Sequence, residues 1–353
     1  MKIAISHRKD SFSEHWLNYC KENNVEFKLV DCYNSEIVDD LRDCDGLMWH
    51  WHHGDPKDVL FARQLIYSLE AMGKKVYPSS STCWHYDDKV GQKYLLEAIG
   101  APTISSYIFY NKAKALKWVD STTFPKVFKL RGGAASINVK LVKSREEAKS
   151  LIEKAFGQGF SARNRFHEFT DRVRKAKKEK SLSSLNHLIR GVGRLLIPTE
   201  FERLNGREKG YIYFQEFMEG NSFDTRVVVI GDKCFTIRRY NRENDFRASG
   251  SGRSEHSPEL FDKRCLKIAF ETSEKLKAQS LAYDFIFDKE NNPRIVEVSY
   301  AFVTREYPGY WDSELNWHKG TINSQYALMA NFIKSVKGED SVISSTATGS
   351  NHH

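Results

Sequence analysis

The sequence predicts an α/β protein, with a small parallel α/β domain at residues 1–80 and two lobes of mixed α+β structure at 81–209 and 210–337. Short apolar strands alternate with helical segments in the first domain, which is typical of a parallel sheet. A turn with adjacent glycines joins two apolar runs at residues 125–142, and longer apolar strands with hairpin signals follow in the last lobe. Residues 338–353 are small and polar, so we expect a disordered tail that ends in a tag remnant.

The composition is that of a globular protein of two or three domains, with 353 residues, 40% hydrophobic and 28% charged. The formal net charge of +8 attracts anions without choosing among nucleotides, nucleic acid and acidic glycans. Six dispersed cysteines without a CxxC pair argue against a zinc ribbon or a redox motif and favour the reduced thiols of the cytoplasm. The first residues are a short strand rather than a signal peptide, and no run of about 18 apolar residues predicts a membrane span.

The first domain contains four short apolar runs that we expect to be strands, and two longer periodic segments that we expect to be helices. No GxGxxG motif follows the first strand, which disfavours a dinucleotide site there. The predicted strands are Lys2–Ser6, Glu26–Val30, Gly46–Trp51 and Lys75–Tyr77, and the predicted helices are Ser11–Asn23 and Asp55–Met72.

A segment rich in tryptophan and histidine ends the third predicted strand, at residues 49–55. Open α/β sheets bind ligands at the carboxyl ends of their strands, so Trp51, His52 and His53 are candidates for substrate contact. Aromatic packing against the neighbouring domain explains the same residues equally well. Metal ligation by His50 and His52 is a third, less favoured interpretation.

The lobe at residues 81–209 is predicted to contain a hairpin that covers a phosphate. Gly132 and Gly133 allow a backbone turn in which N–H groups approach an anion, and Lys129 adds a positive charge at the end of the preceding strand. An ordinary hairpin is an equally good explanation of this stretch taken alone. Around it we expect helices at Asp87–Ile99, Lys112–Val119 and Ser144–Ala155, and strands at Ser105–Tyr110, Pro125–Leu130 and Ile137–Val142.

Residues 157–205 interrupt this pattern and are predicted to be a basic insertion. Nine Lys or Arg stand against three acids between Ser161 and Arg190. Apolar residues at helical spacing indicate an amphipathic helix. The insertion is a candidate docking surface for a polyanion, although a solvated face is the commoner explanation of a charge run.

The lobe at residues 210–337 contains two carboxylates, Asp284 and Glu297, near the centres of adjacent predicted strands. Ser299 lies two residues after Glu297 and therefore faces the same side. Two carboxylates and a hydroxyl form an oxygen site suited to Mg²⁺, while salt bridges to Arg226 or Arg238 are the alternative. The predicted strands are Tyr211–Phe217, Thr225–Ile230, Cys234–Arg239, Ala282–Asp288 and Arg294–Ser299, and the predicted helices are Pro258–Ala278 and Ser324–Val336.

Eight motifs occur in the order found in ATP-grasp enzymes, and the chain resembles that superfamily over residues 80–335. Each motif is weak alone, but the ordered set is specific. The nearest pattern is that of the ribosomal-protein glutamate ligase (RimK-like) type, with D-alanine–D-alanine ligase and glutathione synthetase as more distant relatives. The motifs are Lys89, Phe124–Lys129 with its glycine loop, Gln215–Phe217, Asp224–Arg226, Ile237–Arg239, Phe246–Ser249, Asp284 and Val296–Ser299.

The resemblance implies an ATP-grasp fold with an N-terminal pre-ATP-grasp domain, and ATP and two Mg²⁺ ions as cofactors. By this resemblance the nucleotide-binding residues are Lys89, Lys129, Gly132, Gly133, Gln215, Glu216, Phe217 and Asp224. The residues that would hold the transferring phosphoryl group and an acyl-phosphate are Arg226, Arg238 and Arg247. The metal-binding residues would be Asp284, Glu297 and Ser299. Ser299 stands where the family has Asn, which puts direct coordination by its shorter side chain in doubt.

The activity implied is that of an ADP-forming ligase, which activates a carboxylate as an acyl-phosphate and joins it to an amine. The loop Tyr300–Thr304 replaces the usual Pro-Gly turn, so we expect a different acceptor pocket that includes Tyr300. Aromatic residues suggest a platform for a larger substrate, such as a uronic-acid glycan or a peptide. They are Trp49, Trp51, Tyr300, Tyr307, Tyr310, Trp311 and Trp317.

Two other functions remain open at this point. One is a nucleotide-binding scaffold without turnover that docks an anionic partner through residues 161–190, and the other is a phosphotransferase built on the same scaffold. We expect a cytoplasmic protein that does not bind nucleic acid. The oligomeric state stays open, with a homodimer as one option.

Overall fold

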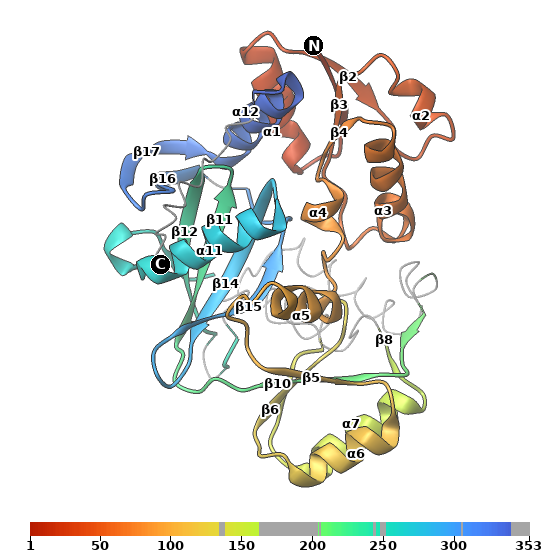
Figure 1. Cartoon of the computed structure of the whole chain (residues 1–353), viewed down its shortest axis with the longest axis vertical. Coiled ribbons are helices and arrows are strands. Elements are labelled where there is room, and N and C mark those ends of the chain that lie inside the picture. The colour runs from red at the N-terminus through yellow and green to blue at the C-terminus, as the bar shows by residue number, and fades with distance from the viewer. Residues whose placement is uncertain are drawn as a thin grey trace, which may run out of the picture.

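The computed structural model describes the chain in three main β-sheets joined by helices (Figure 1). Residues 134–137, which include the second half of the glycine-rich turn, most of the predicted basic insertion 157–205 and most of the predicted tail 338–353 lie outside the described residues. Within the described part, no helix is long and apolar enough to cross a membrane. The described residues are 1–133, 138–161, 204, 206–242, 245–247, 252–304 and 306–339.

The first sheet is parallel, with strand order β2-β1-β3-β4, as the alternating pattern predicted. Its strands are β1 (Lys2–Ser6), β2 (Glu26–Val30), β3 (Gly46–Trp49) and β4 (Lys75–Tyr77). Its helices are α1 (Phe12–Glu22), α2 (Ile37–Asp40), α3 (Pro56–Ala71) and α4 (Ser80–Cys83). The one-turn helices α2 and α4 were not predicted, because four residues are too few to show a helical period.

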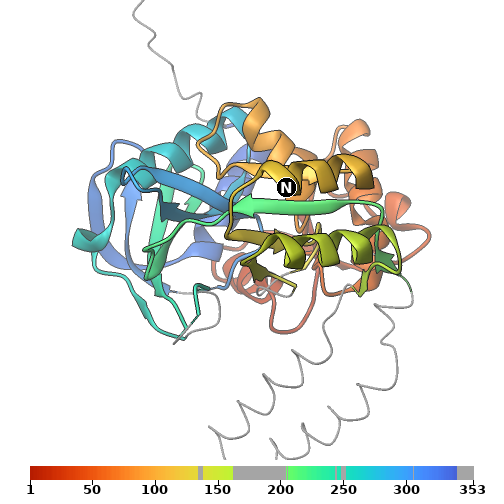
Figure 2. The ribbon, with the colours of Figure 1, turned by 90° about the horizontal axis from the view of Figure 1, so that it is seen from below.

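The second sheet is antiparallel between neighbours along the order β5-β10-β6-β7. Helices α6 (Lys112–Ser121) and α7 (Arg145–Phe156) lie side by side against it (Figures 1 and 2). Its own apolar core includes Phe128 and Phe214. Its strands are β5 (Ser106–Phe109), β6 (Lys126–Lys129), β7 (Lys140–Val142) and β10 (Ile212–Glu216), and the short strands β8 (Phe160–Ser161) and β9 (Arg207–Glu208) pair with each other.

Strand β10 lies beyond the predicted boundary at 209/210, yet it pairs with β5 and β6. A division of the chain at that boundary therefore splits the second sheet. We propose that the last lobe begins after β10 instead.

The third sheet is antiparallel, with the order β15-β14-β11-β12-β16-β17 and β13 paired to β12. Helix α11 (Lys263–Leu276) packs against β11 and β14, while α12 (Ser324–Lys337) contacts β11, β4 and α1 and so ties this sheet to the first one (Figure 1). The strands are β11 (Phe223–Ile230), β12 (Lys233–Tyr240), β13 (Ser254–Glu255), β14 (Ser280–Phe287), β15 (Pro293–Ser299), β16 (Glu306–Asp312) and β17 (Trp317–Asn323). The described residues also include helix α5 (Lys89–Ala98) and the 3₁₀ turn η1 (Pro258–Leu260).

The hairpin β16–β17 was not predicted, and it holds aromatic residues that were assigned to a substrate platform. Tyr307 and Trp311 are 1% and 5% exposed, and the Trp311 ring lies 5.2 Å from that of Trp317. Tyr310 stacks on His318 in the same hairpin, with ring centroids 4.8 Å apart. These rings therefore stabilise the hairpin and its contact with the sheet, and they do not form the predicted platform.

Candidate active site

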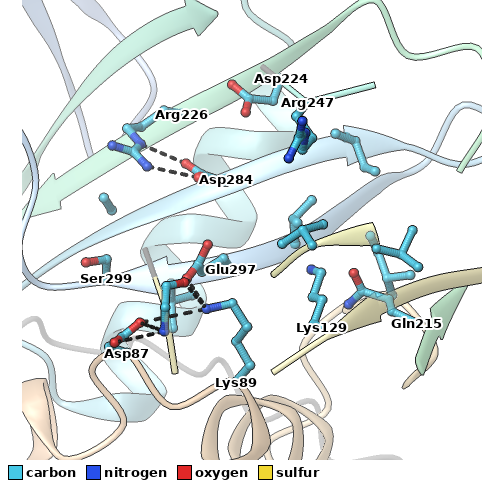
Figure 3. A pocket seen from close by; sticks show the side chains of 18 of the residues that line it. Asp87, Lys89, Lys129, Gln215, Asp224, Arg226, Arg247, Asp284, Glu297 and Ser299 are labelled. Carbon is cyan, nitrogen blue, oxygen red and sulfur yellow. Dashed lines mark hydrogen bonds and ion pairs between the residues drawn. The ribbon is translucent and has the colours of Figure 1, made fainter. Parts of the chain in front are cut away.

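A cavity of about 470 Å³ collects most of the polar residues that the sequence motifs indicated (Figure 3). It is lined by the second and third sheets and by loops of the first domain. Of the predicted site residues, Gly132, Arg238, Trp51 and Tyr300 are not part of its lining. Those that line it are His52, His53, Lys89, Lys129, Gly133, Gln215, Glu216, Phe217, Asp224, Arg226, Arg247, Asp284, Glu297 and Ser299.

The register of the third sheet places its charged residues on one face. Arg226 pairs with Asp284 across β11 and β14, and Asp284 pairs in turn with Glu297 across β14 and β15. Asp224 stands opposite Arg239 on β12. Residues directly opposite each other in an antiparallel pair share a face, so these five side chains all lie on the same side of the sheet.

Asp284 is held by two guanidinium groups. Arg226 donates from Nε and from a terminal nitrogen to the two carboxylate oxygens, at 2.7 and 2.9 Å, and Arg239 lies 2.8 Å from one of them. Burial by itself raises the pKa of Asp284, but the two guanidinium charges outweigh it and hold this pKa well below its usual range. The salt bridge to Arg226, an alternative left open by the sequence, is therefore present.

The second partner of Asp284 is Arg239 rather than the predicted Arg238. Arg239 also holds both oxygens of Asp224, at 2.7 and 2.6 Å, while burial and the charge of Asp284 raise the pKa of Asp224. Arg238 points to the opposite face, where its guanidinium lies 4.0 Å from the ring centroid of Phe223 and donates to the carbonyl of Leu260. Alternation along a strand explains the difference, because adjacent residues face opposite sides.

Lys89 connects Glu297 to the glycine-rich loop. Its Nζ lies 3.3 Å from Glu297 Oε1 and donates to the Gly133 carbonyl at 2.9 Å. Burial lowers the pKa of Lys89, but the charges of Glu297 and Asp87 outweigh burial and raise it. Asp87, which the sequence analysis did not identify, accepts from the Gly133 N–H at 2.9 Å. Residues at the start of α5 therefore hold Gly133, which belongs to the loop that was predicted to cover a phosphate.

Lys129 is the cation of the cavity whose charge is least compensated. It is 6% exposed, and its side-chain ammonium makes no hydrogen bond or ion pair with any residue in the described part of the chain, although its backbone pairs with β10. Burial lowers the pKa of Lys129 to about 8, although the charge of Glu297 opposes that shift. A buried ammonium without a partner is costly, so its position in a cavity indicates a site for an anionic ligand.

The residues predicted to meet an adenine lie at another part of the cavity. Gln215 donates to Ser106 Oγ at 3.1 Å, and Phe217 packs edge-on against Phe246 with centroids 5.6 Å apart. Glu216 accepts from Lys126 Nζ at 2.9 Å, and this lysine is only 2% exposed. Sequence reasoning missed Lys126, whose spacing from Lys129 alone does not separate a structural lysine from a ligand-binding one.

The residues of the predicted Mg²⁺ site can hold one ion if ligand phosphates supply further oxygen ligands. The described residues contain no cluster of three His, Cys, Asp or Glu arranged to hold a metal. Asp284 and Glu297 face each other in register, but Asp284 is already bonded to two arginines, and Ser299 Oγ donates to the Ala301 carbonyl at 2.7 Å. Mg²⁺ commonly binds one or two carboxylates together with substrate phosphates, so Glu297 and Asp284 match that mode for one ion.

The tryptophan and histidine segment divides into a packed part and a lining part. Trp51 and Tyr300 are 1% and 0% exposed, and the Tyr300 hydroxyl donates to the Trp51 carbonyl. They pack together between the domains, as the packing interpretation predicted, and do not contact the cavity as substrate residues. His52 and His53 do line the cavity, and His50 lines it as well.

Comparisons with known proteins agree with this architecture. The fold is similar to that of D-alanine–D-alanine ligase from Bacillus anthracis, at 15% identity over 96% of this chain and 99% of that chain, with a TM-score of 0.54. It is also similar to N5-carboxyaminoimidazole ribonucleotide synthetase from Thermotoga maritima, at 16% identity over 95% and 75% of the two chains, with a TM-score of 0.52. These likenesses define an ATP-grasp fold.

The family match is more specific. Residues 199–308 match the model of the RimK-like ATP-grasp domain. A solved RimK domain protein from Sphaerobacter thermophilus is similar to this chain, at 13% identity over 84% and 90% of the two chains, with a TM-score of 0.50. No curated protein matches the sequence. Residues 199–308 are thus similar to the RimK-like ATP-grasp domain, in agreement with the resemblance indicated by the ordered motifs.

Proposed function

We propose that the protein is an ATP-dependent ligase that joins a carboxylate to an amine through an acyl-phosphate. The observation that supports this most is Lys129, a buried ammonium without a partner among the described residues, in one cavity with Lys89, Asp284 and Glu297. A triphosphate supplies the negative charge that this ammonium lacks. The base end of the cavity, at Gln215–Phe217, offers backbone and aromatic surface for the nucleotide ring.

The chain's own residues orient the reactants and balance charge. The substrate carboxylate attacks the terminal phosphorus of ATP, the bond from that phosphorus to the bridging oxygen breaks, and ADP leaves. An amine then attacks the acyl carbon, phosphate leaves with the bonding electrons, and the amine loses a proton to form the amide. Lys129, Arg226 and Arg247 line the cavity and would hold the phosphoryl oxygens, and no side-chain nucleophile is required.

Glu297 and Asp284 would hold Mg²⁺, which supplies charge neutralisation to the phosphate oxygens when bound. Binding of phosphates also offers new partners to Lys89 and Arg226, which hold these two carboxylates in the structure. The carboxylates would then exchange one kind of positive partner for another. A second ion stays a prediction from the family resemblance.

A panel of candidate carboxylates tests the proposed function. The protein is incubated with Mg-ATP, single carboxylates and hydroxylamine, and acyl-phosphate formation is measured as hydroxamate together with ADP. We expect hydroxamate for at least one class of carboxylate, in equal amount to ADP. A phosphorylated product that hydroxylamine does not trap indicates the phosphotransferase alternative, and tight ATP binding without ADP formation indicates the non-catalytic scaffold.

A further inference from the structure

A second cleft adjoins the central cavity at His52, which lines both. This second cleft has a volume of about 620 Å³ and is formed by the loop that precedes α3 and by the residue Arg8 after β1. It therefore lies at the carboxyl ends of the parallel strands, where open α/β sheets bind ligands. A molecule that reacts in the central cavity can extend past His52 into this cleft.

The second cleft carries two cations with unused donors. The Arg8 guanidinium makes no hydrogen bond in the described part of the chain, and its nearest carboxylate oxygen, on Asp58, is 3.8 Å away. Asp58 is itself occupied, because it accepts from the His52 N–H at 2.8 Å and from the Tyr33 hydroxyl at 2.9 Å. Lys57 lies 5.3 Å from the Tyr33 ring centroid and forms no ion pair with a described residue.

The remaining acid of the cleft, Asp55, is used by the protein. Its carboxylate caps α3 by accepting from the Lys57 N–H at 3.0 Å, and the Tyr33 hydroxyl reaches it at 3.3 Å. The cleft thus presents a planar guanidinium and an ammonium next to the N-terminus of a 16-residue helix. This combination favours a carboxylate or a phosphate group.

Three imidazoles, which we call the histidine wall, stand where the two spaces meet: His52 lines both spaces, and His50 and His53 line the central cavity. His50 is 9% exposed, and its Nε2 has no hydrogen-bond partner among the described residues, while its Nδ1 pairs with Ser11 Oγ at 2.8 Å. Burial, with the nearby charge of Arg8, lowers the pKa of His52 to about 4 and keeps His50 uncharged too. An uncharged imidazole can hydrogen-bond an amine without repelling it. An orphaned buried nitrogen next to the reaction cavity indicates a polar ligand group there.

We propose that the amine substrate passes this histidine wall and carries, away from its reacting nitrogen, an anionic group that Arg8 and Lys57 bind. The proposal rests on the proposed ligase function, whose amine has to approach from outside the phosphate-binding part of the cavity. It narrows the amine class to molecules such as peptides with a free carboxylate or phosphorylated amino alcohols.

Binding of matched probes tests this inference separately from turnover. The probes are glycylglycine and O-phosphoethanolamine, compared by calorimetry with their uncharged counterparts glycylglycinamide and ethanolamine, in the presence of Mg²⁺ and a non-hydrolysable ATP analogue. We expect at least one anionic probe to bind the wild-type protein at least 10-fold more tightly than its counterpart. The anionic probe with the larger gain in affinity over its uncharged counterpart shows whether the cleft prefers a carboxylate or a phosphate.

The variants Arg8→Met and Lys57→Met should each remove most of the affinity difference between the anionic and uncharged probes. Arg8→Lys should keep part of this difference, and the surface control Arg42→Met should keep all of it. Arg8 makes no side-chain hydrogen bond in the described structure, so its variants should fold normally. Equal binding of charged and uncharged probes, or full binding by Arg8→Met, overturns the inference. Hydroxamate formation in the panel assay reports on the ligase function independently, because hydroxylamine carries no anionic group.

Discussion

Substitution of Lys129 by methionine is expected to lower ATP-dependent product formation by about 10²–10³-fold, the effect of losing one preorganised donor to a developing charge. Lys129 supplies a buried positive charge that forms no ion pair with a described residue. Methionine keeps the length of the side chain and removes the ammonium. Hydroxamate and ADP formation at saturating carboxylate measure the change, and calorimetry should show weakened nucleotide binding. Lys140→Met, on the paired strand β7, is the matched control and should stay within about two-fold.

The same variant should not be less stable than the wild-type protein, which separates a functional loss from misfolding. Burial lowers the pKa of Lys129 from 10.5 to about 8, so the folded state disfavours the charged form. The resulting destabilisation is complete below pH 8 and disappears as the pH rises from 8 towards 10.5. Lys129→Met should therefore exceed the wild type in free energy of unfolding at pH 7, with a difference that shrinks above pH 8. An inactive variant that is also less stable at pH 7 contradicts a ligand-binding role.

Substitution of Asp284 by asparagine should cost both stability and activity. The change leaves Arg226 without its carboxylate and removes one of the two partners of Arg239. Breaking a buried ion pair by removing one partner typically costs about 3–5 kcal/mol, which denaturant unfolding can measure. Hydroxamate formation should fall below detection. Asp232→Asn, in the exposed turn between β11 and β12, is the control and should change neither quantity.

A double variant tells the structural and chemical roles of Asp284 apart. In Arg226→Met with Asp284→Leu both charges are replaced by apolar groups, while Arg239 keeps its pair with Asp224. Replacing a whole buried pair is often neutral or stabilising, so most of the lost stability should return. Activity should not return, because the metal and phosphate contacts are gone. Restored stability together with restored activity would rule out our assignment of these two residues.

The sequence was sufficient to predict the faces of individual strands in the site. Asp284, Glu297 and Ser299 were expected on one face, and the register confirms that Asp284 and Glu297 are direct neighbours. The alternation of side chains along one strand does not identify the partner of a residue on the neighbouring strand. The sequence analysis assigned Arg238 to the site, whereas the structure places the neighbouring residue Arg239 there. The turn at Gly231 sets the pairing of β11 with β12, and this pairing places Asp224 opposite Arg239.

Contacts between distant segments were beyond the reach of the sequence. Asp87 meets the loop at Gly133, and Lys126 meets Glu216, only because α5 and β10 pack beside the glycine hairpin. The aromatic residues were misassigned for a related reason. Composition shows that rings are abundant, but it does not show whether they are buried between domains, as Trp51 and Tyr300 are, or exposed to a ligand.

The most direct test is a crystal structure of the protein with a non-hydrolysable ATP analogue and Mn²⁺, which anomalous scattering locates in place of Mg²⁺. We predict phosphate oxygens within hydrogen-bond distance of Lys129 Nζ and a manganese peak against Glu297 and Asp284. A nucleotide bound away from this cavity, or a triphosphate that leaves Lys129 and both carboxylates untouched, would contradict the account.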